Sequence, residues 1–139
     1  MKSLLAACLL LSGLQITAFS QSRCTTYYSV TEVPPAYPGG DEGIMKYGIR
    51  KIIPLISAYY KKVHEYPITS FRGATLYINR QGIVTNVVIT DDRIPASLRN
   101  VLCNEFMKMR GWKPARQHGQ AVCATYLYTI TCMTWQDDD

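Results

Sequence analysis

The chain has 139 residues, of which 47% are hydrophobic, and its formal net charge is +5. This length allows one domain, and a domain of this size buries roughly two-thirds of its unfolded surface, which excludes any need for a structural metal. The basic balance favours anionic surfaces or acidic partner segments, although charge runs of this kind usually form a solvated helix face.

The first 20 residues have the pattern of an export signal. Lys2 supplies the positive n-region, Leu4–Leu14 the apolar centre, and Ala18–Ser20 the small residues ahead of a cleavage site before Gln21. We therefore expect a cleaved signal peptide over 1–20 and a periplasmic or secreted protein, with anchoring by the uncleaved N-terminal segment as the alternative. An exported protein has little access to nucleic acid, so no nucleic-acid partner is expected.

Cysteine usage agrees with export. Cys8 falls within the predicted signal, and four cysteines remain: Cys24, Cys103, Cys123 and Cys132. Four cysteines permit up to two disulfides in three pairings. Cys123 and Cys132 would point to opposite faces of a strand, so each is expected to pair with Cys24 or Cys103, or to stay reduced. Their spacing fits no zinc site, and we expect no metal or cofactor.

The segment after the signal is predicted to be extended. Residues 21–33 form an N-terminal arm in which Thr25–Thr31 is rich in β-branched and aromatic residues. Pro34–Gly40 holds three prolines and two glycines, which indicates an extended entry with a turn. Asp41 is placed to cap the helix that follows.

A helical pattern follows Asp41 and ends at Tyr66-Pro67. Apolar residues recur in it at spacings of three and four, which predicts one buried helix face. That face comprises Met45, Ile49, Ile52, Ile56, Tyr59 and Val63. Pro54 removes one backbone hydrogen bond and clashes with the preceding turn, so a kink or break is expected near Ile53.

Gly73–Asn79 and Ile83–Thr90 alternate in side-chain character, and the short turn Arg80–Gly82 joins them as an antiparallel hairpin. Asp91, Asp92 and Arg93 close this hairpin. The two aspartates are adjacent, so their side chains diverge and make no acid–base pair, and a role in a turn or as a cap is expected.

A second helix is predicted over Pro95–Arg110, and the Trp112–Val122 stretch then ends it and leads into a last strand, Val122–Met133. Gly111 suits a residue just past a helix end, and Gly119 permits a turn. The core-facing residues of the helix are expected to be Leu98, Val101, Leu102, Phe106 and Met109.

The order helix, strand, strand, helix, strand predicts an α+β fold. Its two helices pack on one face of a three-stranded antiparallel sheet, with Gly73–Asn79 in the middle and the last strand at an edge. On the last strand, the set containing Ala124, Tyr126, Tyr128 and Ile130 is the more apolar and is expected to meet the helices.

Two motifs carry a family resemblance. Pro35–Gly40, with its Tyr-Pro-Gly-Gly ending, and Trp112-Lys113-Pro114-Ala115 followed by Gly119 and Val122 resemble the carboxy-terminal domain of TonB energy transducers, in its Bacteroidetes-type variety. The resembling domain spans 34–134 and precedes an acidic tail at 135–139. The motif residues are Pro38, Gly39, Gly40, Trp112, Pro114 and Gly119.

The resemblance implies that the last strand binds a short peptide of an envelope protein, such as an outer-membrane transporter, by strand addition. An unpaired strand edge suits this task because it offers a row of donors and acceptors. The partner-binding residues implied are Cys123, Thr125, Tyr126, Leu127, Tyr128, Thr129 and Thr131. A homodimer and association with a membrane both stay open.

The chain departs from the family in its spacer. Only 18 residues separate Phe19 from Pro38, and they extend to at most roughly 60–65 Å, too short to cross a periplasm. We therefore predict a stand-alone, non-catalytic interaction module. The alternatives are a membrane-anchored transducer or accessory of outer-membrane transport, and a small exported enzyme that uses a free cysteine with His64 or His118.

Overall fold

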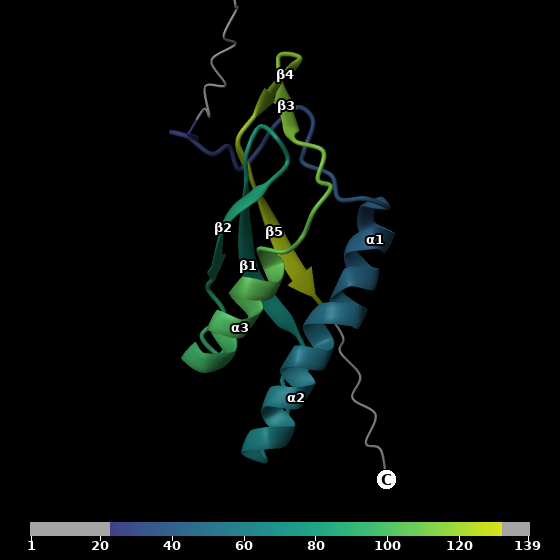
Figure 1. Ribbon diagram of the computed structural model, residues 1–139, viewed down its shortest axis with the longest axis vertical. Helices are drawn as coiled ribbons and strands as arrows, with labels where there is room; N and C mark the ends of the chain where they lie inside the picture. Colours follow the sequence, from purple (N-terminus) through teal and green to yellow (C-terminus); the bar gives the residue numbers. More distant parts are fainter. Residues whose placement is uncertain (1–22, 132–139) are drawn as a thin grey trace, which may run out of the picture.

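The computed structural model describes residues 23–131, so the predicted signal, the acidic tail and Cys132 lie outside the described residues. Its elements are α1 (Gly40–Tyr47), η1 (Gly48–Ile52), α2 (Ile53–Val63), β1 (Phe71–Ile78), β2 (Val84–Ile89), α3 (Ala96–Phe106), β3 (Ala115–Gln117), β4 (Gln120–Val122) and β5 (Ala124–Ile130). Figure 1 shows α1, η1 and α2 as one helical column beside the sheet.

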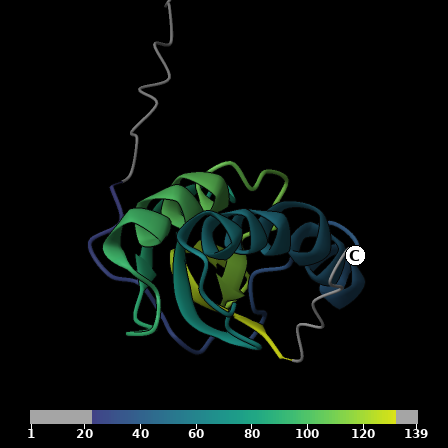
Figure 2. The same cartoon turned by 90° about the horizontal axis from the view of Figure 1, so that it is seen from below.

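The main sheet confirms the predicted topology. Its strand order is β2-β1-β5, and both pairings are antiparallel, which puts the hairpin's first strand in the middle and β5 at an edge. The helices cover one face of this sheet (Figure 2). Within residues 23–131 no helix is both long enough and apolar enough to cross a membrane.

The core lies between the helices and the helix-facing side chains of the sheet. Tyr128 of β5 is almost fully buried and packs edge-on against Phe106 of α3, with ring centroids 4.8 Å apart. Ile52 and Ile56 from the helical column and Leu76 from β1 are fully buried beside them. The apolar set predicted to face the helices on the last strand is therefore confirmed.

The helical column changes its phase at a π turn. Ile53 N–H donates to the Gly48 carbonyl five residues back, and Pro54 follows directly. A π turn widens the backbone just where the proline ring would clash with the preceding turn. The irregularity predicted near Ile53 is thus present, but the column continues through it.

This π turn overturns part of the predicted buried face. Met45, Ile49 and Val63 are exposed, whereas Gly48, Ile52, Ile56 and Tyr60 are buried at a constant spacing of four. In a regular α-helix, positions four apart drift by roughly 40° per step, so such a stripe would wind around the helix. The extra residue of the π turn cancels much of this drift. The predicted buried face assumed a regular helical period, and it therefore included residues that are exposed.

Two helix starts differ from expectation. Gly39, with φ of 80°, is the N-cap of α1 and no side chain caps it, so Asp41 lies inside the first turn instead of capping. There its carboxylate still interacts favourably with the positive end of the helix dipole. In α3 the N-cap is Pro95, and Val101 is exposed although Leu98 and the other predicted core residues are buried.

The Trp112 stretch contains a small hairpin that the sequence did not reveal. Strands β3 and β4 pair antiparallel through a turn at His118 and Gly119, both of which have positive φ. Two consecutive positive φ values match the twist of a two-residue hairpin. Trp112 itself is buried between Tyr37 and Tyr126, with ring centroids 5.1 and 5.0 Å away, and so ties the chain entry to β5.

Gly48 is where the column touches β5, and replacing it tests that contact. A β-carbon at Gly48 would overlap the Tyr128 hydroxyl and lie 3.3 Å from Cδ1 of Ile130. Gly48→Ala should therefore lower the free energy of unfolding by about 1–3 kcal/mol in urea denaturation. In a Tyr128→Phe background the overlap is gone, and most of this loss should disappear. Equal losses in both backgrounds would show that the contact does not limit the helix.

Candidate functional site: the free edge of β5

The backbone groups of β5 alternate between β1 and the outside of the sheet. Thr90 N–H donates to the Gly73 carbonyl at 2.8 Å, so the odd-numbered residues of β1 bond to β2 and the even-numbered ones to β5. The register pairs Leu76 with Tyr126 and Ala74 with Tyr128. The even-numbered residues of β5 therefore bond inward, and Leu127 and Thr129 present their N–H and C=O groups outward.

In the described part of the chain, Tyr28 is the one residue that pairs with the outer side of β5. It forms a parallel bridge opposite Ala124, in which Tyr28 N–H donates to the Cys123 carbonyl at 3.0 Å and Thr125 N–H donates to the Tyr28 carbonyl at 2.9 Å. Beyond this bridge the outward carbonyl of Thr125 and both groups of Leu127 and Thr129 face no strand of residues 23–131. At about 3.3 Å per residue, this free edge is roughly 16 Å long.

On the opposite edge of the sheet, formed by β2, side chains occupy the outward backbone groups of one residue. Val87 of β2 has its backbone groups on the outer side, and both are occupied by side chains. Its N–H donates to Oδ1 of Asn86 at 2.9 Å, and its carbonyl accepts from Sγ of Cys103 at 3.8 Å. Such capping blocks a foreign strand, because the backbone offers it nothing to bond at this position. Val87 lies at the middle of β2, so its capping interrupts that edge, whereas Leu127 and Thr129 are consecutive outward residues of β5.

An apolar groove of about 260 Å³ runs between the helical column and β5. Ile44, Met45 and Ile49 line it on the helical side, and Tyr126 and Ile130 line it on the strand. Met45 is 63% exposed and Ile49 is 56% exposed, which is unusual for large apolar side chains one helical turn apart. Figures 1 and 2 place α1 over the outer side of β5, so this groove borders the free edge.

The side chains implied as partner-binding fall into two groups. Those of Thr125, Leu127 and Thr129 lie on the open face of the sheet, where Leu127 is 61% exposed. The side chains of Tyr126 and Tyr128 face the helices, Tyr128 as part of the core, and the backbones of both residues pair with β1. Cys123 is buried, and Thr131 lies just beyond the strand at the mouth of the groove.

Of the four cysteines, Cys24 and Cys123 form a disulfide, one of the pairings left open for Cys123. Cys103 is reduced and half-buried, and burial raises the pKa of its thiol. A thiol with a raised pKa holds little thiolate and is a weak nucleophile. His118 is an exposed turn residue whose imidazole Nδ1 lies 3.3 Å from the Glu32 carboxylate.

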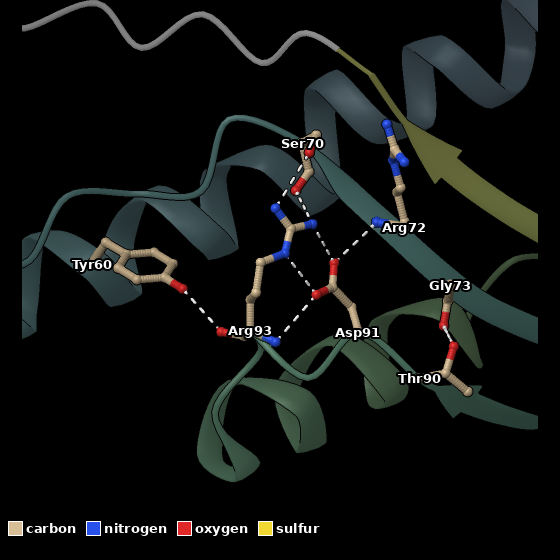
Figure 3. A network of polar contacts seen from close by, with 7 residues as sticks. All are labelled: Tyr60, Ser70, Arg72, Gly73, Thr90, Asp91 and Arg93. Carbon is tan, nitrogen blue, oxygen red and sulfur yellow. Dashed lines mark hydrogen bonds and ion pairs between the residues drawn. The ribbon is translucent and has the colours of Figure 1, made fainter.

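The carboxylate of Asp91 is buried and joins several elements at the far end of the sheet (Figure 3), which its predicted role in a turn did not imply. Asp91 accepts hydrogen bonds from the backbone N–H of Arg72 at 3.2 Å and from Nη2 of Arg93 at 2.7 Å. Arg93 also reaches the Ser70 carbonyl, and its own carbonyl accepts from the Tyr60 hydroxyl at 3.5 Å. The role in a turn predicted for Asp91 is confirmed. Its burial is compensated by the several hydrogen-bond donors around the carboxylate.

The bonds from Arg93 hold the pKa of the Asp91 carboxyl below its usual range, with help from the backbone N–H of Arg72 and against the opposing effect of burial. Because the Asp91 carboxylate and the Arg93 guanidinium are paired with neighbours inside the fold, this cluster joins β1, β2 and α2 and has a structural role.

The described residues contain no group of three His, Cys, Asp or Glu side chains that could hold a metal ion. No protein-family model, curated protein or solved structure matches the chain. The free edge of β5 and its groove are therefore the features from which a function is inferred.

Replacing Asp91 with asparagine should destabilise the fold, because an amide nitrogen would face donors. We expect Asp91→Asn to lower the free energy of unfolding by about 2 kcal/mol at pH 7, measured by urea denaturation. The neighbouring Asp92 is exposed, so Asp92→Asn is the matched control and should change little.

The same pair of variants tests the pH dependence. Because the folded-state pKa of Asp91 is lowered, its contribution is present above the unfolded pKa of about 4 and is lost as pH falls through the folded value. Wild type should therefore lose more stability than Asp91→Asn when the pH drops below about 4. Parallel pH profiles for the two proteins would contradict this assignment.

Proposed function

We propose that this protein is a non-catalytic interaction module that captures an extended segment of a partner protein by adding it as a fourth strand to β5. The observation that carries the proposal is the contrast between the two sheet edges. The outward backbone groups of Leu127 and Thr129 face no strand in the described residues, whereas those of Val87 are capped. Strand addition uses such an edge for affinity and adjacent pockets for specificity.

The apolar side chains around the edge support the same proposal. Leu127 lies on the open sheet face, while Met45 and Ile49 border the edge from the helical side. An added strand would place alternate side chains against these two surfaces, because side chains alternate across a strand. Apolar surface on both sides of an open edge favours a peptide with apolar residues over a purely polar one.

The partner we propose is a protein or peptide of the cell envelope, such as an outer-membrane transporter, in keeping with the resemblance to TonB carboxy-terminal domains. This proposal includes export of the chain, and it depends on the amino-terminal signal pattern. A catalytic role has less support, since the one free cysteine in the described residues has a raised thiol pKa and is bonded to the Val87 carbonyl.

A proline at position 127 tests the edge without disturbing the sheet. Leu127→Pro removes an outward N–H that no strand of residues 23–131 uses, and proline is tolerated on an edge strand when its missing donor faces outward. With a photo-crosslinking residue at position 129, capture of the partner in cells should fall about tenfold or more, while the midpoint of thermal unfolding changes by only a few degrees.

A charge at the same position has a matched control. Val88 and Leu127 are both exposed and both pair with Thr75, one from each side, so they lie in one row on the open face. Leu127→Asp should abolish crosslinking from position 129, and Val88→Asp should leave it intact. Capture that survives both Leu127 variants would rule out binding through this edge.

A further inference from the structure

The amino-terminal arm, residues 23–33, lies against the sheet, touches the candidate binding strand at Tyr28 and reaches β3 at Val33. The Tyr27 ring packs edge-on against Tyr77 of β1, with centroids 5.0 Å apart, and its hydroxyl lies 2.9 Å from Oγ1 of Thr85 in β2. The next residue, Tyr28, makes the parallel bridge to β5. The arm therefore passes over all three strands on the face away from the helices (Figure 2).

The two ends of the arm are attached by different kinds of bond. At its far end Cys24 is joined to Cys123 by the disulfide. At its base Val33 exchanges backbone hydrogen bonds with Arg116, at 3.1 and 2.8 Å, and Ala36 does the same with Lys113. Opening the disulfide would leave the base in place, and only the contacts of Tyr27 and Tyr28 would then hold the part of the arm that lies on the sheet.

That part of the arm occupies backbone groups that continue the free edge. The Cys123 carbonyl and the Thr125 N–H bond to Tyr28, and they are the next outward groups in line after the Thr125 carbonyl. A strand added to β5 can therefore reach Thr125 but cannot pass it while Tyr28 is in place. Release of the arm would add one more pair of hydrogen-bonding groups to the edge and would uncover Tyr77.

Resting on the proposed function, we propose that the arm is a thiol-sensitive strap: the Cys24–Cys123 disulfide holds Tyr28 on β5 and shortens the edge open to a partner, and reduction lengthens it. The reductant is a dithiol. Its thiolate attacks the half-buried Cys24 sulfur and displaces Cys123 as a thiolate, which takes a proton. The second thiol of the dithiol then displaces Cys24 from the mixed disulfide, so the dithiol is oxidised and both cysteines become thiols.

Amide hydrogen exchange on the full chain tests the strap without any partner. After reduction with dithiothreitol, and in Cys24→Ser, exchange of the Thr125 N–H should accelerate about tenfold or more and approach that of the Leu127 N–H. The N–H groups of Tyr126 and Tyr128 bond to β1 and should change less than about twofold. Cys103→Ser and Cys132→Ser, without reductant, should leave Thr125 protected.

Two results would overturn the strap. One is a Thr125 N–H that stays protected after reduction and in Cys24→Ser. The other is an equal acceleration of all amides of β5, because the disulfide would then stabilise the whole fold and not the arm alone.

Crosslinking separates the strap from the proposed function. A photo-crosslinker at position 127 should capture the partner in wild type and in Cys24→Ser, whereas one at position 125 should give at least about fivefold more product in Cys24→Ser. No capture at 127 in either protein would reject the edge function and leave the exchange data to decide on the strap. Capture at 127 with an unchanged yield at 125 would reject the strap as a control on binding.

Discussion

A sheet of three strands has two edges, and every backbone group on them must find a partner or face water. In this protein that constraint is met on β2 by the side chains of Asn86 and Cys103, which cap Val87. On β5, among residues 23–131, a backbone partner on the outer side is present only at the start of the strand, where Tyr28 bonds. The capped position interrupts the edge of β2, whereas Leu127 and Thr129 form a continuous outward stretch on β5.

The helical column supplies the apolar side chains beside the free edge of β5. Its π turn keeps Gly48, Ile52, Ile56 and Tyr60 in contact with the sheet and turns Met45 and Ile49 away from it. Because Gly48 has no side chain, the column can lie close to Tyr128 and Ile130. The apolar groove along β5 is thus a consequence of one irregular turn and one glycine.

The disulfide links two distant parts of the chain at the point where the edge begins. Cys24 and Cys123 are 99 residues apart, and closing a loop of that length restricts the unfolded chain by about 4–5 kcal/mol in the chain-entropy model. The same bond fixes the arm on the sheet and limits the length of the free edge. Stability and accessibility of the edge are therefore connected through one covalent bond.

The sequence by itself determined the elements of the main sheet and the helices that cover it, with their order, but not the small β3–β4 hairpin. Alternation in the hairpin and in the last strand, together with the helical stripe of Leu98, Leu102 and Phe106, was enough to predict an α+β fold with β5 at an edge. These patterns are local, and burial on one face imposes them directly. The pairing of Cys123 was left open between two partners, because spacing along a strand excludes a partner but does not select one.

Only the tertiary structure decided which residues surround the edge. The exposure of Met45 and Ile49 depends on a π turn that shifts the helical phase, and a regular period misplaces both residues. The capping of Val87 by Cys103 and the bridge from Tyr28 to β5 join residues 16 and about 95 positions apart. Such contacts follow from how the elements pack against each other, so no local pattern records them, and they settle which part of the edge stays free.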